Sequence, residues 1–217
     1  MYENSCEYLE RTRAAVASLI KVTETFREPL YREDPPVIVG HYRGASDRDE
    51  RIREWQGKNA ARIARWHEIE RQYFDNAFSL AAVCGALLQI AYSAISAYCE
   101  PVDLPDNLAL PLRTGSKPSQ FYRGREVNGL PLGLVVFAGR NQAAHVDEGM
   151  PANKLVREVF SAIASGGPSL SGGESWDPAF DLRNTRVKHY AHNVVALIGW
   201  TSIDAYEQDM RSMLGLT

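Results

Sequence analysis

Apolar residues recur at helical intervals along most of this chain. Between residues 5 and 28 the spacing of Leu9, Val16 and Ile20 predicts an amphipathic helix. Pro29 is expected to end that helix, because proline has no backbone N–H to donate.

The same spacing predicts five more helices. We expect Asp47 or Asp49 to cap the first of them, and we expect a short strand or an extended connection at 37–46. Because no section is rich in strands, the fold class is predicted to be all-α, a helical bundle with long irregular loops. We expect a single domain over 1–217, made of an N-terminal helical region (1–75) and a core (76–217). The five helices are expected at 48–73, 76–99, 132–146, 153–165 and 185–214.

The segment 76–99 has no charged side chain and is long enough to cross a bilayer. Polar residues such as Asn76, Gln89 and Ser93 interrupt it, and much of its apolar content is alanine. We therefore expect the central buried helix of the bundle, with a membrane span as the alternative.

Composition limits the possible partners and compartments. The net charge of −3 gives no overall basic field, so any contact with nucleic acid must come from a local patch. Cys6, Cys84 and Cys99 are an odd number without short paired spacing, which argues against disulfides and a zinc site. The first residues lack the pattern of a signal peptide, so we expect a cytoplasmic protein without a membrane anchor.

A local basic stretch lies in the irregular segment 100–130. Aromatic residues stand among its cations, a combination that can stack bases and hold phosphates. The alternative is a solvated loop whose aromatic side chains are buried. The candidate RNA-binding residues of this stretch are Arg113, Lys117, Arg123 and Arg125.

The most informative segment is 139–145, Gly-Arg-Asn-Gln-Ala-Ala-His. Arg140 can hold a phosphate with its planar fork of donors, and His145 can move a proton near neutral pH. On a straight helix, residues four apart share a face, so Asn141 and His145 are expected to lie together. The three residues therefore indicate chemistry on a phosphodiester.

Arginine followed four to six residues later by histidine occurs four times in the chain, against roughly 1.3 expected by chance. Requiring asparagine after the arginine leaves two matches. The second comprises Arg183, Asn184 and His189, and we expect it to open the last helix as an anion-binding cluster. It is either the true motif or an accessory to the first.

The segment 140–145 resembles the motif of the HEPN superfamily, small α-helical proteins that include many metal-independent RNases. The resemblance extends over about 76–165, where a buried helix, a linker and the motif helix follow in order. It implies a homodimer with a composite site, no cofactor and no metal. It also implies a toxin or phage-defence effector, with a cognate antitoxin or defence-system protein as a possible partner.

The resemblance also implies roles for the motif residues. His145 would serve as general base or acid when a ribose 2′-hydroxyl attacks the adjacent phosphate of RNA. Arg140 would stabilise the charge on the phosphoryl oxygens, and Asn141 would position the phosphate or His145. The products would be a 2′,3′-cyclic phosphate and a 5′-hydroxyl.

Two other functions stay open on the sequence alone. One is a non-catalytic HEPN-like module that binds RNA, a nucleotide or a protein; the other is a helical interaction protein in which Arg140 and His145 merely pair with Asp147 or Glu148. His189 and His192 also stand at a spacing that can ligate a metal, although no partner carboxylate is evident.

Overall fold

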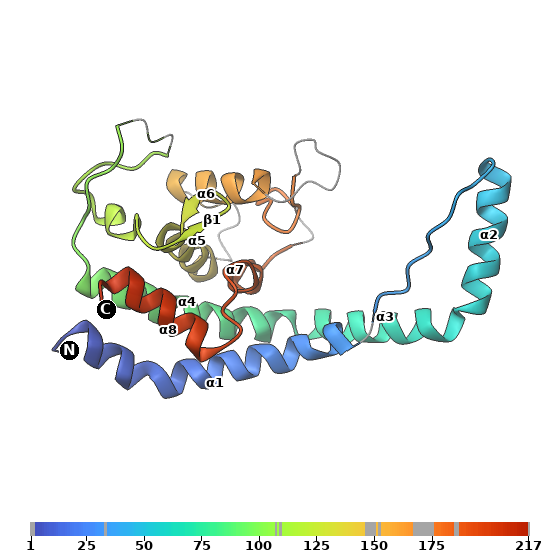
Figure 1. Ribbon diagram of the computed structural model, residues 1–217, viewed down its shortest axis with the longest axis horizontal. Coiled ribbons are helices and arrows are strands. Elements are labelled where there is room, and N and C mark those ends of the chain that lie inside the picture. The colour runs from blue at the N-terminus through green and yellow to red at the C-terminus, as the bar shows by residue number, and fades with distance from the viewer. Residues whose placement is uncertain are drawn as a thin grey trace. The chain divides into compact units, whose positions relative to one another are not determined.

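The protein is all-α, as the sequence predicts (Figure 1). The computed structural model describes residues 3–32, 34–106, 108, 110–145, 151, 153–166, 176–184 and 187–216, without the side chains of 30–32. The elements of this described part are α1 (Ser5–Arg32), α2 (Ala45–Lys58), α3 (Ala60–Asp75), α4 (Ala77–Tyr98), the 3-10 helix η1 (Lys117–Phe121), β1 (Glu126–Val127), β2 (Leu130–Pro131), α5 (Leu132–Ala144), α6 (Lys154–Ser165), α7 (Ala191–Leu197) and α8 (Ile203–Leu214).

The chain forms two compact units. Unit 1 combines the residues up to Thr23 with those from Phe78 onward, and unit 2 is Glu24–Ala77. The start of α1 belongs to unit 1 because its apolar face packs on α4. The Tyr8 hydroxyl donates to the carbonyl of Ile90 at 3.0 Å, and Thr23 Oγ1 lies 3.7 Å from Cys84 Sγ.

The α4 helix confirms the buried helix expected at 76–99. Among the described helices it is the one with the length and apolar composition of a membrane span. Eight of its residues are buried, including Leu80, Leu87, Leu88 and Ile95, which have no exposed surface. This is the pattern of a core helix whose apolar side chains are removed from water by neighbouring helices.

The motif helix α5 lies between α4 and α7. At Gly139 a Cβ atom would stand 2.9 Å from Val194 Cγ1 and 3.1 Å from Leu88 Cδ1. Only glycine allows so close an approach of three helices. Gly139 therefore fixes the position of Arg140, the next residue along α5.

The C-terminal region differs from the sequence prediction. The single helix expected at 185–214 is wrong, because α7 and α8 are separate and the described residues 187–190 precede them without helical structure. Gly199 between the helices adopts φ 71°, a left-handed conformation that ends a helix. The following Trp200 is fully buried and donates its Nε1–H to Asp209 at 2.9 Å.

Two boundaries near the N-terminus also differ. The α1 helix continues past Pro29 to Arg32, so the expected stop is wrong; a proline one turn from a helix end removes only one hydrogen bond. The helix expected at 48–73 is two helices, α2 and α3, separated at Asn59, whose amide donates to the carbonyl of Trp55 at 2.9 Å. Neither Asp47 nor Asp49 is the N-cap of α2, since Gly44 occupies that position.

The irregular segment 100–130 holds more structure than expected. It contains η1 and a short antiparallel hairpin, in which Val127 pairs with Leu130. Asn128 and Gly129 form the turn, with φ values of 48° and 76°. Asparagine and glycine are the residues that tolerate this left-handed turn.

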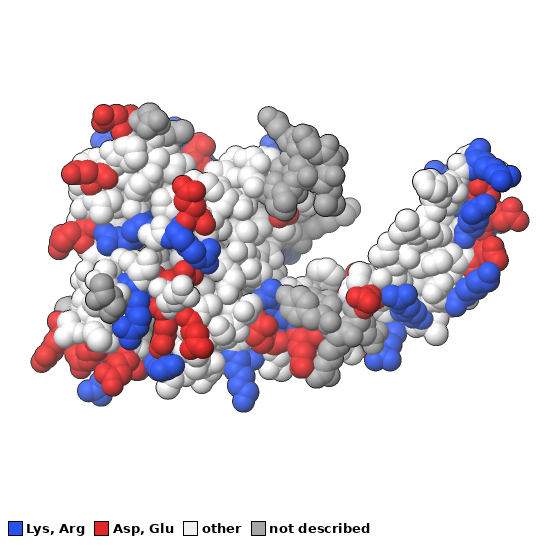
Figure 2. Space-filling view, viewed as in Figure 1, with Lys and Arg blue, Asp and Glu red and all other residues white. Residues whose placement is uncertain are grey.

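Unit 2 has no buried side chain among its described residues. The stretch 34–44 contains no strand, in line with an extended connection, and α2 and α3 carry closely mixed charges. Figure 2 shows basic and acidic side chains interspersed over the visible face of the molecule. Within each unit, the described residues visible in this view therefore form no extended basic surface of the kind that recruits RNA without specificity.

Candidate functional site

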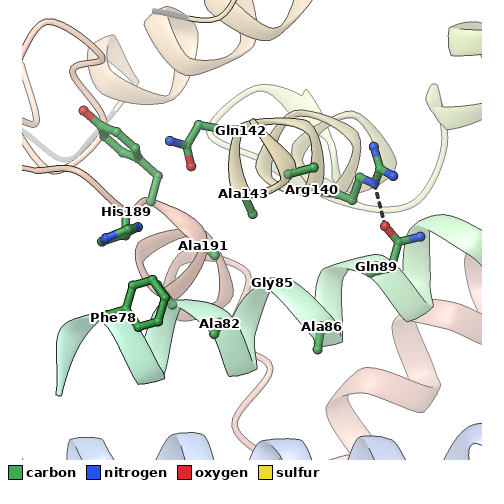
Figure 3. A pocket seen from close by; sticks show the side chains of 13 residues that line it. Phe78, Ala82, Gly85, Ala86, Gln89, Arg140, Gln142, Ala143, His189 and Ala191 are labelled. Atoms are coloured by element: carbon green, nitrogen blue, oxygen red, sulfur yellow. Dashed lines mark hydrogen bonds between the residues drawn. The ribbon is translucent and has the colours of Figure 1, made fainter. Parts of the chain in front are cut away.

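A pocket of about 510 Å³ in unit 1 brings together residues of α4, α5 and the segment before α7. Its α4 side is built largely from small apolar residues, including Ala82, Gly85 and Ala86. Figure 3 shows His189 and Arg140 on opposite sides of the pocket, with α4 running along one wall between them. A concave, mainly apolar space with a few polar groups is the usual form of a ligand site.

Arg140 is held on one side of the pocket by two contacts. Its Nε donates to Gln89 Oε1 at 2.7 Å, shown as a dashed line in Figure 3, and its guanidinium carbon lies 4.7 Å from the centre of the Tyr92 ring. Within the described part of the chain, its two terminal nitrogens make no hydrogen bond. A pre-positioned guanidinium with free N–H groups is suited to bind a phosphate or a carboxylate.

Asn141 and His145 do not line this pocket. Asn141 donates from Nδ2 to the carbonyl of Phe137 at 2.7 Å, one turn back along α5. His145 is exposed and lies just past the last residue of α5, as its C-cap. Of the three motif residues, Arg140 alone is therefore part of the described lining of this pocket. Asp147 and Glu148, the alternative partners of Arg140 and His145, lie outside the described residues.

The residues of the second sequence match, Arg183, Asn184 and His189, do not all line this pocket. His189 lines the same pocket as Arg140, and its ring centre lies 5.5 Å from that of Phe78. Arg183 instead pairs with Asp181 at 3.0 Å and lies over the ring of Trp176, while the amide of Asn184 donates to the carbonyl of Pro178. The expected helix start at these residues is wrong, because 181–184 form a turn and α7 begins at Ala191.

The four cations of 100–130 fall into two groups. Arg113 and Lys117 are exposed. Arg123 donates to the carbonyls of Glu100 and Met213, at 2.7 and 3.1 Å. Arg125 binds Asp209 through Nε and Nη2 at 2.9 and 3.0 Å, and Nη2 also donates to the carbonyl of Ile198. These last two arginines therefore connect the hairpin segment to the C-terminal region.

Sequence reasoning missed the two glutamines of the pocket. Gln89 orients Arg140, and Gln142 is only 4% exposed, with no hydrogen-bond partner for its Oε1 among the described residues. Their positions were the available signal in the sequence. Gln142 lies two residues after Arg140, and Gln89 lies about one helical turn after Ala86 on the otherwise apolar α4. A buried polar side chain on an otherwise apolar helix is expected to bind a hydrogen-bond partner or a ligand.

Tyr190 also lines the pocket, but it is a poor candidate for proton transfer. Burial, together with the charge of Asp181, raises the pKa of Tyr190 to about 12. Its hydroxyl donates to the carbonyl of Asp181 at 2.8 Å. The imidazole among the described residues of this pocket is that of His189.

Comparison with protein-family models, with curated proteins and with solved structures finds no match to this chain.

Proposed function

We propose that the protein binds RNA and that the pocket between α4 and α5 holds one of its phosphates through Arg140. The observation that carries the proposal is the Arg140 guanidinium, which Gln89 and Tyr92 fix at the edge of the pocket and whose two terminal nitrogens make no hydrogen bond within the described chain. Charge-assisted hydrogen bonds from such a group to a phosphate are about twice as strong as neutral ones. The resemblance of 140–145 to the HEPN motif favours RNA over other phosphate-bearing ligands.

A charge pair at Ala86 tests this site without touching Arg140. Ala86 is exposed, lines the pocket and lies one turn before Gln89 on α4. Glutamate and lysine are both good helix formers, so neither should disturb the helix. We expect Ala86→Glu to weaken the binding of a labelled single-stranded RNA severalfold and Ala86→Lys to strengthen it, measured by fluorescence anisotropy at fixed salt.

Truncation of Arg140 should have a larger effect. A charge-assisted hydrogen bond contributes about 1.5–3 kcal/mol, so Arg140→Ala is expected to weaken binding by roughly 10- to 100-fold. Arg211→Ala removes an exposed arginine from α8, outside the pocket, and is the matched control. Equal losses of RNA affinity in the two variants would show that only the overall charge matters, which would contradict the proposal.

The second candidate function is metal-independent RNA cleavage. The observation in its favour is that imidazoles accompany Arg140: His189 in the same pocket and His145 at the end of the same helix. An imidazole would take the proton of a ribose 2′-hydroxyl, whose oxygen then attacks the adjacent phosphorus. The bond from phosphorus to the 5′-oxygen breaks, and a second acid returns a proton to that oxygen. Arg140 would stabilise the charge on the phosphoryl oxygens.

His189 and Arg140 lie on opposite sides of the pocket, so one phosphate is not expected to meet both. We therefore propose that a cleaving form is a homodimer in which His145 of one protomer completes the site of Arg140 in the other. A role as a cytoplasmic toxin or phage-defence effector, restrained by an antitoxin or another defence-system protein, follows from the same resemblance.

Mixing two inactive variants tests the composite site. Wild type, Arg140→Ala and His145→Ala are incubated with RNA in EDTA, and the products are examined for 2′,3′-cyclic phosphate ends. In a mixed dimer of the two variants, one site regains both wild-type residues, so activity should return on mixing. Cleavage by His145→Ala at the wild-type rate would exclude His145, and a mixture that stays inactive would exclude the shared site.

A further inference from the structure

The amide of Gln142 is a polar group without a partner at the pocket. The residue is 4% exposed, and within the described chain its side chain makes no hydrogen bond, so that Oε1 is buried without a donor. Figure 3 shows this amide extending from α5 toward the side of the pocket where His189 lies. A buried acceptor left unpaired is costly, and such a group in a native structure calls for a functional explanation.

The space beside this amide is apolar and built from small side chains. Gly85 on α4 lies opposite Ala143 on α5, where an added Cβ would stand 3.5 Å from Ala143 Cβ, and Ala82 and Ala86 belong to the same lining. The exposed ring of Phe78, with 68% of its surface accessible, stands next to His189 in the same lining. Flat apolar walls with an aromatic ring at one side suit a planar heterocycle.

The polar groups of the pocket are therefore of two kinds. Arg140 offers free cationic N–H groups suited to a phosphate. Gln142 offers an amide, which is complementary to the pairing edge of a nucleobase, where a donor stands beside an acceptor. A bare phosphate would use the first group and leave the second unpaired.

We infer that the pocket receives one unstacked nucleobase of single-stranded RNA, whose pairing edge binds the Gln142 amide while its phosphate lies against Arg140. This inference rests on the proposed function, and it names the class of RNA. In a duplex the pairing edge is already occupied by the opposite base, so double-stranded RNA cannot enter this site. Recognition of splayed-out bases is how proteins usually read RNA sequence.

The test compares ligands with and without a base. The binding of the monophosphates of adenosine, guanosine, cytidine and uridine is measured by calorimetry beside that of ribose 5-phosphate. We expect at least one nucleotide to bind about tenfold more tightly than ribose 5-phosphate, the equivalent of two ordinary hydrogen bonds. Gln142→Leu should reduce that nucleotide to the affinity of ribose 5-phosphate and leave ribose 5-phosphate unchanged.

Stability measurements and two further variants, Ala82→Leu and Arg140→Ala, separate a loss of binding from a loss of folding. Gln142→Leu removes an unpaired amide, so its melting temperature should equal or exceed that of the wild type. Ala82→Leu fills the pocket from an exposed position of α4 and should abolish the preference for nucleotides. Arg140→Ala should weaken nucleotides and ribose 5-phosphate alike.

Other results would contradict either the base site alone or RNA binding through Arg140 as well. Equal binding of nucleotides and ribose 5-phosphate, a nucleotide preference that survives Gln142→Leu, or no binding of any nucleotide overturns the base site. If single-stranded RNA still binds in an Arg140-dependent way in those cases, the proposed function survives. If RNA binding does not depend on Arg140, the proposed function fails with it.

Discussion

The described part of this protein contains two triads of tryptophan, aspartate and arginine. In the first, called the buried triad, the tryptophan and the aspartate are buried, although the arginine side chain is 49% exposed. In the second, called the exposed triad, the tryptophan and the arginine are exposed. In the buried triad, Asp209 accepts from Trp200 Nε1 at 2.9 Å and from Arg125 Nε at 2.9 Å. In the exposed triad, Asp181 accepts from Trp176 Nε1 at 3.1 Å and from Arg183 Nε at 3.0 Å. Trp200 has no accessible surface, whereas Trp176 is 43% exposed.

The two triads hold the same three residue types, but Asp181 also accepts from the backbone N–H of Arg183, whereas Arg125 also donates to the carbonyl of Ile198. Their comparison contrasts a local surface cluster with one that joins distant segments around a buried indole. Water can replace each partner at Asp181, and exposed ion pairs contribute little to stability. At Asp209 the loss of one donor leaves a buried carboxylate oxygen with fewer hydrogen bonds and no free access of water to replace them. Both arginines were sequence candidates for RNA contact, yet each has an intramolecular carboxylate partner, unlike Arg140 with its free terminal nitrogens.

The largest expected effect is the loss of the buried carboxylate. Asp209→Ala leaves the Trp200 N–H without an acceptor in the core, and we expect a loss of about 2–3 kcal/mol in the free energy of unfolding. Asp181→Ala makes the same change at the surface and should alter stability far less. Denaturant unfolding of both variants measures the difference, and equal losses would show that burial does not separate the triads.

Two arginine truncations should separate stability from binding. Arg125→Ala removes the hydrogen bonds to Asp209 and to the Ile198 carbonyl, and we expect a loss of about 1–2 kcal/mol with unchanged RNA affinity. Arg140→Ala removes one hydrogen bond and one ring contact, so its loss should stay below about 1 kcal/mol while RNA affinity falls. A reversed pattern, measured by unfolding and anisotropy together, would place the RNA at the hairpin.

Replacement of the unpaired amide of Gln142 should increase the stability of the protein. Gln142→Leu replaces a buried group that has no acceptor or donor by an apolar one of similar size. We expect the free energy of unfolding to rise by about 1–2 kcal/mol. A fall of that size in thermal and denaturant unfolding would mean that the amide is already satisfied in the free protein.

The smallest effect concerns Tyr190 at high pH. In the unfolded chain this tyrosine ionises near its ordinary pKa of about 10, whereas in the folded protein burial raises the pKa to about 12. The contribution of the neutral Tyr190 to folding stability is therefore complete below pH 10 and is lost as the pH rises toward 12. Tyr190→Phe should cost about 1 kcal/mol at neutral pH, from the bond to the Asp181 carbonyl, and should lose less stability than the wild type between pH 10 and 12.

The sequence predicted the elements whose apolar periodicity is long and uninterrupted. The buried helix at 76–99, the motif helix and the helix at 153–165 all occur in the structure, as α4, α5 and α6. The errors fall where one residue changes the backbone locally: Asn59 divides a helix in two, and Gly199 ends α7. The hairpin turn at Asn128 and Gly129 carried its signal in the sequence, since this dipeptide is typical of such turns.

The site was predictable in part. Arg140 and His189 were candidates on residue type and spacing, and the structure places both at one pocket. Gln89 and Gln142 could not be found in that way, because their importance depends on which neighbours they meet across α4 and α5. Likewise, nothing in the spacing of Arg125 indicated that Asp209, far along the chain, would be its partner.

A crystal structure of the protein with a short single-stranded RNA or a bound nucleotide would test the binding site most directly. We expect a phosphate oxygen about 3 Å from a terminal nitrogen of Arg140 and the base edge at hydrogen-bond distance from the Gln142 amide. Density for the ligand on another surface, with the pocket between α4 and α5 empty at saturating concentration, would show that the RNA binds elsewhere.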